Sequence, residues 1–184
     1  MMFHIKADSR TGERIGVQMY NYAEVTIRRA ELSEVDVIKK IINEAYTPVK
    51  KKLSREPAAL TEGLGKISRN IQMGTQYVAF VGDQVVGTMR IHLRGQIGVM
   101  ERLAVSSKYR GRRIGTMLVE FGENLLSHMN AQCIEIEVYG AIEEQLDFYN
   151  RLGYQETSRM ERIGEEIVVM RKDLCETDEE DEEY

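Results

Sequence analysis

Leu103–Leu118 has the sequence LAVSSKYRGRRIGTML, which passes from an apolar strand through a basic loop into an amphipathic helix. The first turn of a helix offers backbone N–H groups without intrahelical partners and the positive end of the helix dipole. Three arginines add charge there, and two glycines allow close approach to the backbone: Arg110, Arg112, Arg113, Gly111 and Gly115. The segment therefore predicts a binding site for a phosphate or pyrophosphate.

The helix that follows this loop has one apolar face. Its apolar residues recur at three- and four-residue steps: Ile114, Met117, Leu118, Phe121 and Leu125. We expect this face to pack on a sheet and so to fix the helix start. Lys108–Arg113 also admits two other interpretations, a solvated charged corner and a patch for nucleic acid.

Periodicity and chain breakers predict further elements on both sides of the loop. Strands are expected at Glu24–Arg28, Gln76–Val81, Gln84–Leu93, Gln96–Val105, Cys133–Tyr139, Gln155–Glu161 and Glu165–Arg171. Helices are expected at Glu31–Tyr46, ended by Thr47-Pro48, at Ala58–Met73, interrupted by Gly63 and Gly65, and at Ile142–Leu152. This order predicts an α/β fold, a mixed sheet with helices on both faces.

The loop and a later aromatic segment together resemble the GNAT superfamily of N-acetyltransferases. The family signature is Gln or Arg, two residues, Gly, one residue, then Gly or Ala; Arg110 and Gly115 match its ends, and Arg113 stands at the first glycine. Phe148–Tyr154 is similar to the family's aromatic-Tyr-x-x-x-Gly-aromatic segment. The resemblance covers roughly residues 23–174.

The resemblance implies a mostly antiparallel sheet in which two neighbouring parallel strands splay apart to admit acetyl-CoA as cosubstrate. The backbone of Leu103, Ala104 and Val105 would pair with the pantetheine amides. The pyrophosphate would be held by the loop and first helical turn: Arg110, Gly111, Arg112, Arg113, Ile114, Gly115 and Thr116. Many members place an asparagine that touches the cofactor just after the second splayed strand, and Ile142 stands at that position.

Acetyl transfer to an amine requires a base for the amine and an acid for the departing thiolate. Tyr149 matches the tyrosine that the family places beside the sulfur, and a phenol is protonated at neutral pH; its structural alternative is a core aromatic. Glu101 is the first candidate for the base, on a strand face expected to include Val99, Leu103 and Val105, where apolar neighbours could raise its pKa. Glu137 is its rival, and either carboxylate could instead be solvated or paired, Glu101 with Arg102 for example.

In the family the acceptor pocket lies between the first two helices and the last hairpin. Here it would involve Tyr46, Thr47, the exposed Lys50–Lys52 loop and the Arg159–Ile163 turn, and the lysines favour an anionic acceptor. The expected function is an acyltransferase that moves an acetyl group from acetyl-CoA to a primary amine, on a small molecule or a peptide or protein N-terminus, by direct transfer in a ternary complex. The alternative is a non-catalytic CoA-binding or protein-interaction module with a degenerate cofactor site.

Composition is consistent with one domain of 184 residues, of which 42% are hydrophobic. We expect an N-terminal extension at 1–22, the acetyltransferase domain at 23–174 and an acidic disordered tail at 175–184, whose seven acids leave the other residues a net charge of +2. Such a charge does not call for nucleic acid as a partner. A homodimer is compatible with the sequence.

Cysteines, histidines and apolar runs bear on location and metal binding. The two cysteines, Cys133 and Cys175, and the three scattered histidines have no metal-ligand spacing, so we expect no metal site. There is no signal-like N-terminus and no apolar run of membrane-spanning length, which favours a cytoplasmic protein that does not insert into membranes.

Overall fold

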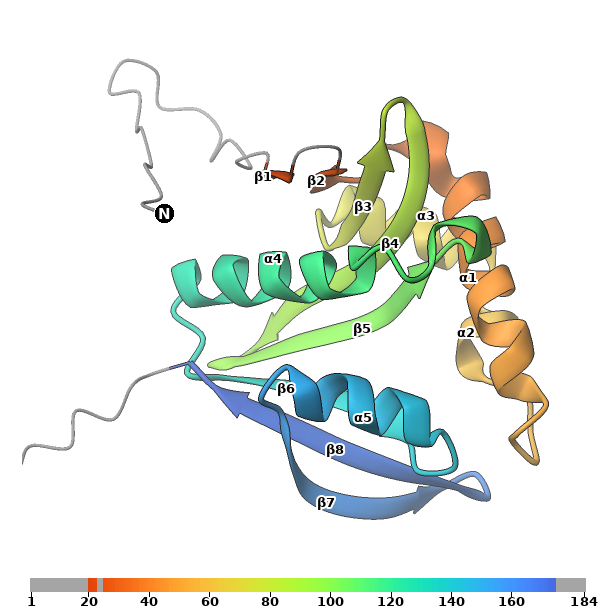
Figure 1. Cartoon of the computed structure of the whole chain (residues 1–184), viewed down its shortest axis with the longest axis vertical. Coiled ribbons are helices and arrows are strands. Elements are labelled where there is room, and N and C mark those ends of the chain that lie inside the picture. The colour runs from red at the N-terminus through yellow and green to blue at the C-terminus, as the bar shows by residue number, and fades with distance from the viewer. Residues whose placement is uncertain (1–19, 23–24, 175–184) are drawn as a thin grey trace, which may run out of the picture.

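The computed structural model describes residues 20–22 and 25–174, which form one eight-stranded sheet with helices on both faces (Figure 1). The expected acidic tail and all but Tyr20–Tyr22 of the expected N-terminal extension lie outside the described residues. The strands are β1 (Tyr20–Tyr22), β2 (Val25–Arg29), β3 (Gln76–Val81), β4 (Gln84–Arg94), β5 (Ile97–Val105), β6 (Cys133–Tyr139), β7 (Gln155–Arg162) and β8 (Glu165–Asp173). The helices are α1 (Val35–Lys50), α2 (Ala58–Thr61), α3 (Leu64–Gln72), α4 (Ile114–His128) and α5 (Glu143–Arg151), with 3₁₀ turns η1 (Leu32–Glu34) and η2 (Ser107–Tyr109).

The strand order is β1-β2-β3-β4-β5-β6-β8-β7. Among the described strands, β5 and β6 are the one parallel pair, and every other neighbouring pair is antiparallel. A parallel pair needs a crossover connection, which α4 supplies here. The predicted fold class is confirmed: a mixed, mostly antiparallel sheet with helices on both faces.

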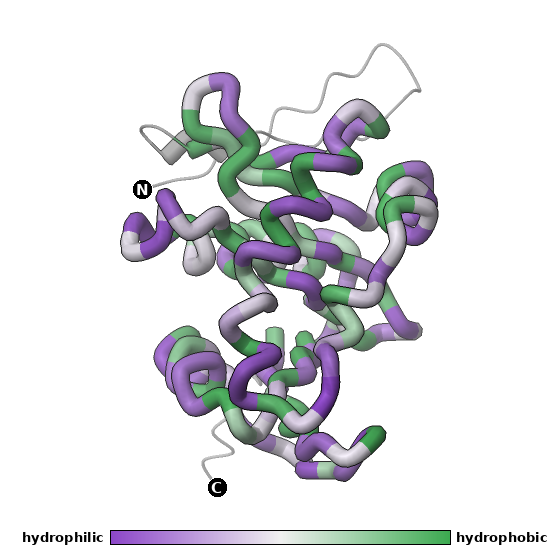
Figure 2. The backbone as a smooth tube through the Cα atoms, turned by 90° about the vertical axis from the view of Figure 1, so that its right-hand side faces the viewer, coloured by the Kyte–Doolittle hydropathy of each residue, from purple (hydrophilic) through white to green (hydrophobic). Residues whose placement is uncertain are grey.

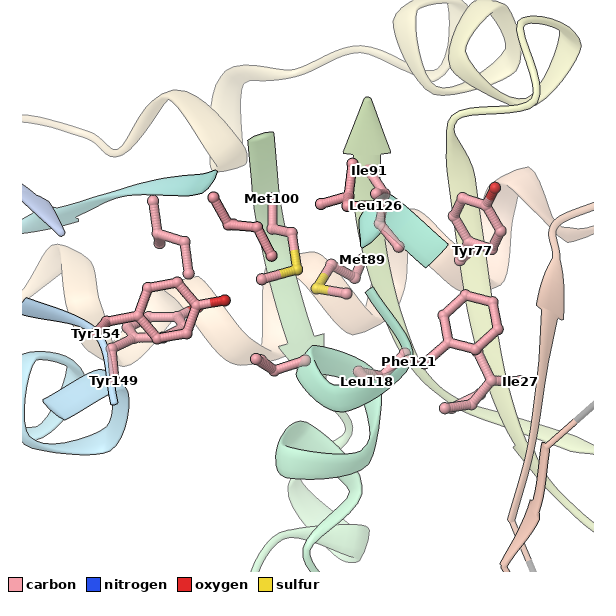
Figure 3. Close-up of a cluster of buried hydrophobic side chains, with 14 of the residues drawn as sticks. Ile27, Tyr77, Met89, Ile91, Met100, Leu118, Phe121, Leu126, Tyr149 and Tyr154 are labelled. Atoms are coloured by element: carbon pink, nitrogen blue, oxygen red, sulfur yellow. The ribbon is translucent and has the colours of Figure 1, made fainter. Parts of the chain in front are cut away.

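Two apolar clusters fill the two faces of the sheet. On one face α4 and α5 cover a cluster that includes Met89 and Met100, which lie side by side near Leu118 and Leu126 (Figure 3). On the other face α1, α2 and α3 cover a second cluster that includes Ile38, the first of three buried isoleucines of α1. The tube in Figure 2 changes between hydrophilic and hydrophobic every few residues, as expected for elements with one buried side.

The predicted strands all form, with ends within about two residues of those expected. The expected interruption between α2 and α3 is confirmed, because Gly63 is the extended residue before α3. The expected end of the first helix at Thr47-Pro48 is wrong: α1 continues through Pro48 to Lys50. Proline removes one helical hydrogen bond, and the carbonyl left without it, that of Glu44, accepts a hydrogen bond from Arg110 instead.

In the part of the chain that the structure describes, no helix combines the length and apolar character needed to cross a bilayer.

Candidate active site

The central feature of the site is the divergence of β5 and β6. The two strands pair only at their beginnings, from Ile97↔Cys133 to Val99↔Glu135. Beyond these pairs they separate, and an open cleft of about 1770 Å³ lies between them. The splay expected from the family resemblance is therefore present, at the ends of the strands that face α1 and α5.

A β-bulge at Arg102 changes which side chains of β5 face the cleft floor. Between the pairs Arg90↔Glu101 and Thr88↔Ala104, β5 has one residue more than β4, and Arg102 has a φ of 58°. Glu101 therefore lies on the face covered by α1 to α3, together with Ala104, whereas Leu103 and Val105 pack on the α4 side. The expectation that Val99, Glu101, Leu103 and Val105 share one face is wrong, because an inserted residue reverses the alternation.

The basic loop leads into the start of α4 at the mouth of the splay. Gly111 has a φ of 76° and Arg113, the residue before α4, a φ of 61°, both in the left-handed region. No side chain caps this helix end. The N–H groups of Ile114, Gly115 and Thr116 are thus first-turn donors without intrahelical acceptors, which is the arrangement that binds a phosphate.

The predicted cofactor-binding residues divide into two groups. Those that line the cleft are Leu103, Ala104, Val105, Arg110, Gly111 and Gly115. The side chains of the others lie elsewhere: Arg112 stacks on Tyr109, Arg113 points toward Glu120 at 4.0 Å, and Ile114 is buried in the core. Arg112, Arg113, Ile114 and Thr116 therefore offer backbone groups to the cleft entrance rather than side chains that line it.

Tyr149 lies on α5 and lines the cleft opposite the loop. It is buried, and its ring makes an edge-to-face contact with Phe148 at 5.0 Å. A second edge-to-face contact joins it to Tyr154 at 5.7 Å, and Figure 3 shows these two tyrosines together. Burial raises the pKa of its phenol well above the usual value. Tyr46 of α1 lines the same cleft, and burial raises its pKa to about 12. Both phenols hold their protons at neutral pH.

Glu101 is paired rather than set among apolar groups. Its carboxylate accepts a hydrogen bond from Arg90 at 3.0 Å and lies 3.7 Å from Arg102. Both arginines also bind Glu62, whose side chain is 1% exposed. The expectation of apolar neighbours is wrong, because the bulge turns Glu101 toward this cluster; the pairing with Arg102 is the structural alternative seen in the sequence.

Glu137 lines the cleft on β6 and is held by Arg162 of β7, which donates to both carboxylate oxygens at 2.6 and 2.9 Å. The hydrogen bonds from Arg162 hold the pKa of Glu137 below its usual value. A lowered pKa makes this carboxylate a weaker proton acceptor than a free glutamate.

The acceptor end of the cleft differs from the expected pocket. Tyr46, Arg162 and Ile163 line it, but Thr47, Arg159 and Lys50–Lys52 do not. Lys50 pairs with Glu56 at 2.8 Å, and Lys52 pairs with Glu144 at 2.5 Å. Neighbouring carboxylates neutralise two of the three lysines. The lysines therefore no longer support the prediction of an anionic acceptor. Ile142, at the family's asparagine position, is buried at the start of α5.

Sequence reasoning missed the charged groups beneath the cleft. Arg90 could have been noticed in the sequence, since it interrupts the apolar run of β4. A charge at such a position needs a buried partner. Its partner Glu62 could not have been found in this way, because Glu62 lies between α2 and α3, where no periodic sequence pattern surrounds it. Arg162, which holds Glu137, likewise could not be assigned before the register of the last hairpin was known.

Residues 72–156, which include the basic loop and Tyr149, match the acetyltransferase (GNAT) domain family. This segment of the chain is similar to GNAT acetyltransferase domains. This match confirms the predicted family and its acyltransferase class. No match is found among curated proteins.

Solved structures share the fold at low sequence identity. The PaiA N-acetyltransferase from Thermoplasma acidophilum, in complex with coenzyme A, superposes with a TM-score of 0.72 at 14% identity, over 81% of this chain and 98% of that one. The ribosomal-protein-S18-alanine N-acetyltransferase from Escherichia coli gives 0.69 at 14% identity, over 85% and 97%. The NatC complex bound to Gag peptide and CoA gives 0.66 at 18% identity, over 83% and 99%. The GNAT fold of this chain is thereby confirmed.

Proposed function

We propose that this protein transfers the acetyl group of acetyl-CoA to a primary amine, on a small molecule or at a peptide or protein N-terminus, within a ternary complex. The observation that carries the proposal is one continuous cleft: it runs from the uncapped start of α4 along the separated strands β5 and β6 to Tyr149. Two structures of the same fold are named as N-acetyltransferases, one of them in complex with coenzyme A, and they support the same chemistry.

The residues at the cleft entrance fit the pyrophosphate of acetyl-CoA. Arg110 supplies positive charge, and the first turn of α4 supplies free N–H donors next to Gly111. Leu103–Val105 of β5 border the gap left by β6 and have backbone groups free to pair with an extended, amide-bearing chain such as pantetheine. When bound, acetyl-CoA would supply the acetyl thioester.

Tyr149 is the proposed general acid. Its hydroxyl belongs to a buried side chain of the cleft wall, and its raised pKa keeps the proton available for the departing sulfur. Tyr149 therefore moves a proton at one defined atom, its phenolic oxygen, while the surrounding aromatic rings keep water from that side of the cleft.

Glu101 remains the proposed base, with Glu137 as the alternative. The Glu101 side chain is 33% exposed, and one of its carboxylate oxygens lies 3.7 Å from the guanidinium of Arg102, whereas both oxygens of Glu137 accept short hydrogen bonds. Glu101 can thus take a proton from the amine, directly or through water. An amine that arrives uncharged needs no base to remove a proton before it attacks, so its positioning in the cleft would make either carboxylate less necessary as a base.

Calorimetric titration with acetyl-CoA tests the cofactor site. We expect micromolar binding by the wild-type protein and its loss in the double variant Arg110→Ala, Arg112→Ala, which leaves the fold intact because both side chains are exposed. Release of free thiol in the presence of a panel of amines then identifies the acceptor. If the wild-type protein fails to bind acetyl-CoA, the proposed function is wrong and the alternative of a degenerate cofactor site takes its place.

A further inference from the structure

The basic loop is attached to the helix on the acceptor side of the cleft at one residue, Glu44 of α1. The Glu44 carboxylate accepts hydrogen bonds from the Ser106 hydroxyl at 3.1 Å and from the Ser107 backbone N–H at 3.4 Å. Ser106 joins β5 to η2, and Ser107 is the first residue of η2, at the point where the chain leaves the splayed strand. One carboxylate oxygen therefore holds the beginning of the loop.

The backbone of Glu44 makes a second attachment. In a regular helix its carbonyl would accept the N–H of the residue four positions later, but that residue is Pro48, which has no N–H. The guanidinium of Arg110 donates to this carbonyl at 3.4 Å. The proline thus leaves an acceptor free within α1, and the loop arginine occupies it.

The same turn of α1 contributes to the acceptor end of the cleft. Ala45, Tyr46 and Val49 line it, one to five residues after Glu44. The loop that fits the pyrophosphate and the wall that would face the amine are therefore joined at Glu44. No motif of the sequence pointed to this link, because Glu44 lies 62 residues before Ser106.

We propose that Glu44 is a positioning residue that holds the Ser106–Arg110 segment in the conformation that binds acetyl-CoA. The proposal rests on the function proposed above. The loop residues Ser107, Lys108 and Arg110 to Arg113 are exposed and contribute little to the core, so their order depends on such attachments. A preformed loop binds its ligand more tightly because less chain freedom is lost on binding.

A second effect of Glu44 opposes the first. Its negative charge lies near a site for an anionic ligand, so charge alone would make the residue unfavourable for binding. The two effects predict opposite results when the side chain is removed: loss of affinity if Glu44 positions the loop, and a gain if it only repels the ligand.

The experiment compares acetyl-CoA dissociation constants, by calorimetry, of the wild type, Glu44→Ala, Glu44→Gln and the control Asn43→Ala, whose side chain is exposed on the adjacent position. We expect Glu44→Ala to bind about tenfold more weakly, as for loss of hydrogen bonds to a charged group. Glu44→Gln keeps an oxygen acceptor, so its dissociation constant should remain within about threefold of the wild-type value. The same is expected of Asn43→Ala. All four proteins should melt within a few degrees of one another.

A double-mutant cycle adds an independent test. If Ser106 and Glu44 act through their mutual hydrogen bond, Ser106→Ala weakens binding alone but adds no further loss to Glu44→Ala. Losses that multiply would overturn the proposal, as would a Glu44→Ala protein that binds as tightly as the wild type, or a Glu44→Gln protein as weak as Glu44→Ala. A wild-type protein that does not bind acetyl-CoA would instead refute the proposed function itself.

Discussion

Two arginines, Arg102 in the cleft and Arg113 next to its entrance, adopt a left-handed backbone conformation that usually belongs to glycine. Arg102 forms the bulge of β5, and Arg113 precedes α4 at the position where the GNAT signature has glycine. Such a conformation costs a residue with a side chain on the order of 1 kcal/mol. The backbone of the loop therefore keeps the geometry that a glycine would give, although the side chain is that of arginine.

Substitutions at Arg113 test this strain. We expect Arg113→Val to lower the melting temperature by about 3 to 6 °C, because a β-branched residue is poorly tolerated at positive φ. In Arg113→Gly the relief of strain and the greater freedom of the unfolded chain nearly cancel, so the melting temperature should change by less than about 2 °C. The exposed contact of Arg113 with Glu120 adds little to either comparison. Equal melting temperatures for the two variants would contradict this prediction.

Removal of the Tyr149 hydroxyl tests its role as the acid. Tyr149→Phe keeps the ring contacts with Phe148 and Tyr154, so the fold and acetyl-CoA binding should persist. We expect the turnover number for thiol release to fall about 100-fold, the usual contribution of a general acid. The matched control is Tyr154→Phe, which removes the hydroxyl of the neighbouring buried tyrosine. A Tyr149→Phe enzyme with normal turnover would show that Tyr149 is only a core aromatic.

At the scale of elements, the approach of α4 to the sheet depends on glycine. A Cβ added at Gly122 would collide with the sulfur of Met100 and lie 2.9 Å from the terminal carbon of Met89. One added at Gly98 of β5 would lie 2.7 Å from Leu126 of α4. This close contact holds α4, which begins with the proposed phosphate-binding turn, against the strand that diverges from β6.

Two glycine substitutions should therefore have opposite effects on stability. Gly122→Val overfills the space above Met89 and Met100, which costs about 1 to 3 kcal/mol and lowers the melting temperature by about 3 to 10 °C. Gly65→Ala in α3 meets no atom within 4 Å and replaces glycine within a helix, so it should raise the melting temperature by about 2 °C. Thermal unfolding followed by circular dichroism measures both, and a stable Gly122→Val protein would show that the two methionine side chains or α4 can move to make room.

Across the whole molecule, a buried charge cluster connects the helices of the proposed acceptor side to the floor of the cleft. Glu62, between α2 and α3, binds Arg90 of β4 and Arg102 at the bulge of β5, and both arginines contact Glu101. Burial alone would raise the pKa of Glu62, but the hydrogen bonds and charges of Arg90 and Arg102 outweigh it and hold the pKa below its usual value. Removal of any one member of the cluster should destabilise the fold, since a buried charge without its partner is strongly unfavourable.

This cluster should make stability depend on pH. Because the folded pKa of Glu62 lies below its unfolded value of about 4.5, its contribution is present above that pH and is lost as the pH falls through the folded pKa. We expect Glu62→Gln to lower the free energy of unfolding by about 3 kcal/mol at pH 7 and by much less near pH 3. Urea unfolding across this range measures the difference, with Glu56→Gln at an exposed ion pair as control. A difference that stays constant with pH would contradict the prediction.

The sequence by itself determined the strands and helices, the basic loop before α4 and the candidate acid Tyr149. Each of these follows from a local sequence pattern. Apolar and polar residues alternate in the strands, apolar residues recur at three- and four-residue steps in the helices, and the family resemblance rests on the spacing of Arg110, Gly115 and Tyr149. Local patterns act over a few residues, and the structure preserved them because packing favoured the same faces.

Only the tertiary structure decided which charges meet and which way Glu101 points. The bulge at Arg102 reversed the face of β5, Glu62 reached Arg90 across 28 residues, and Arg110 reached the Glu44 carbonyl that Pro48 leaves free. These contacts depend on which elements become neighbours in the sheet, and the residues involved lie far apart in the chain. No periodicity within one segment holds that information, so the electrostatics of the cleft emerge only when the sheet is assembled.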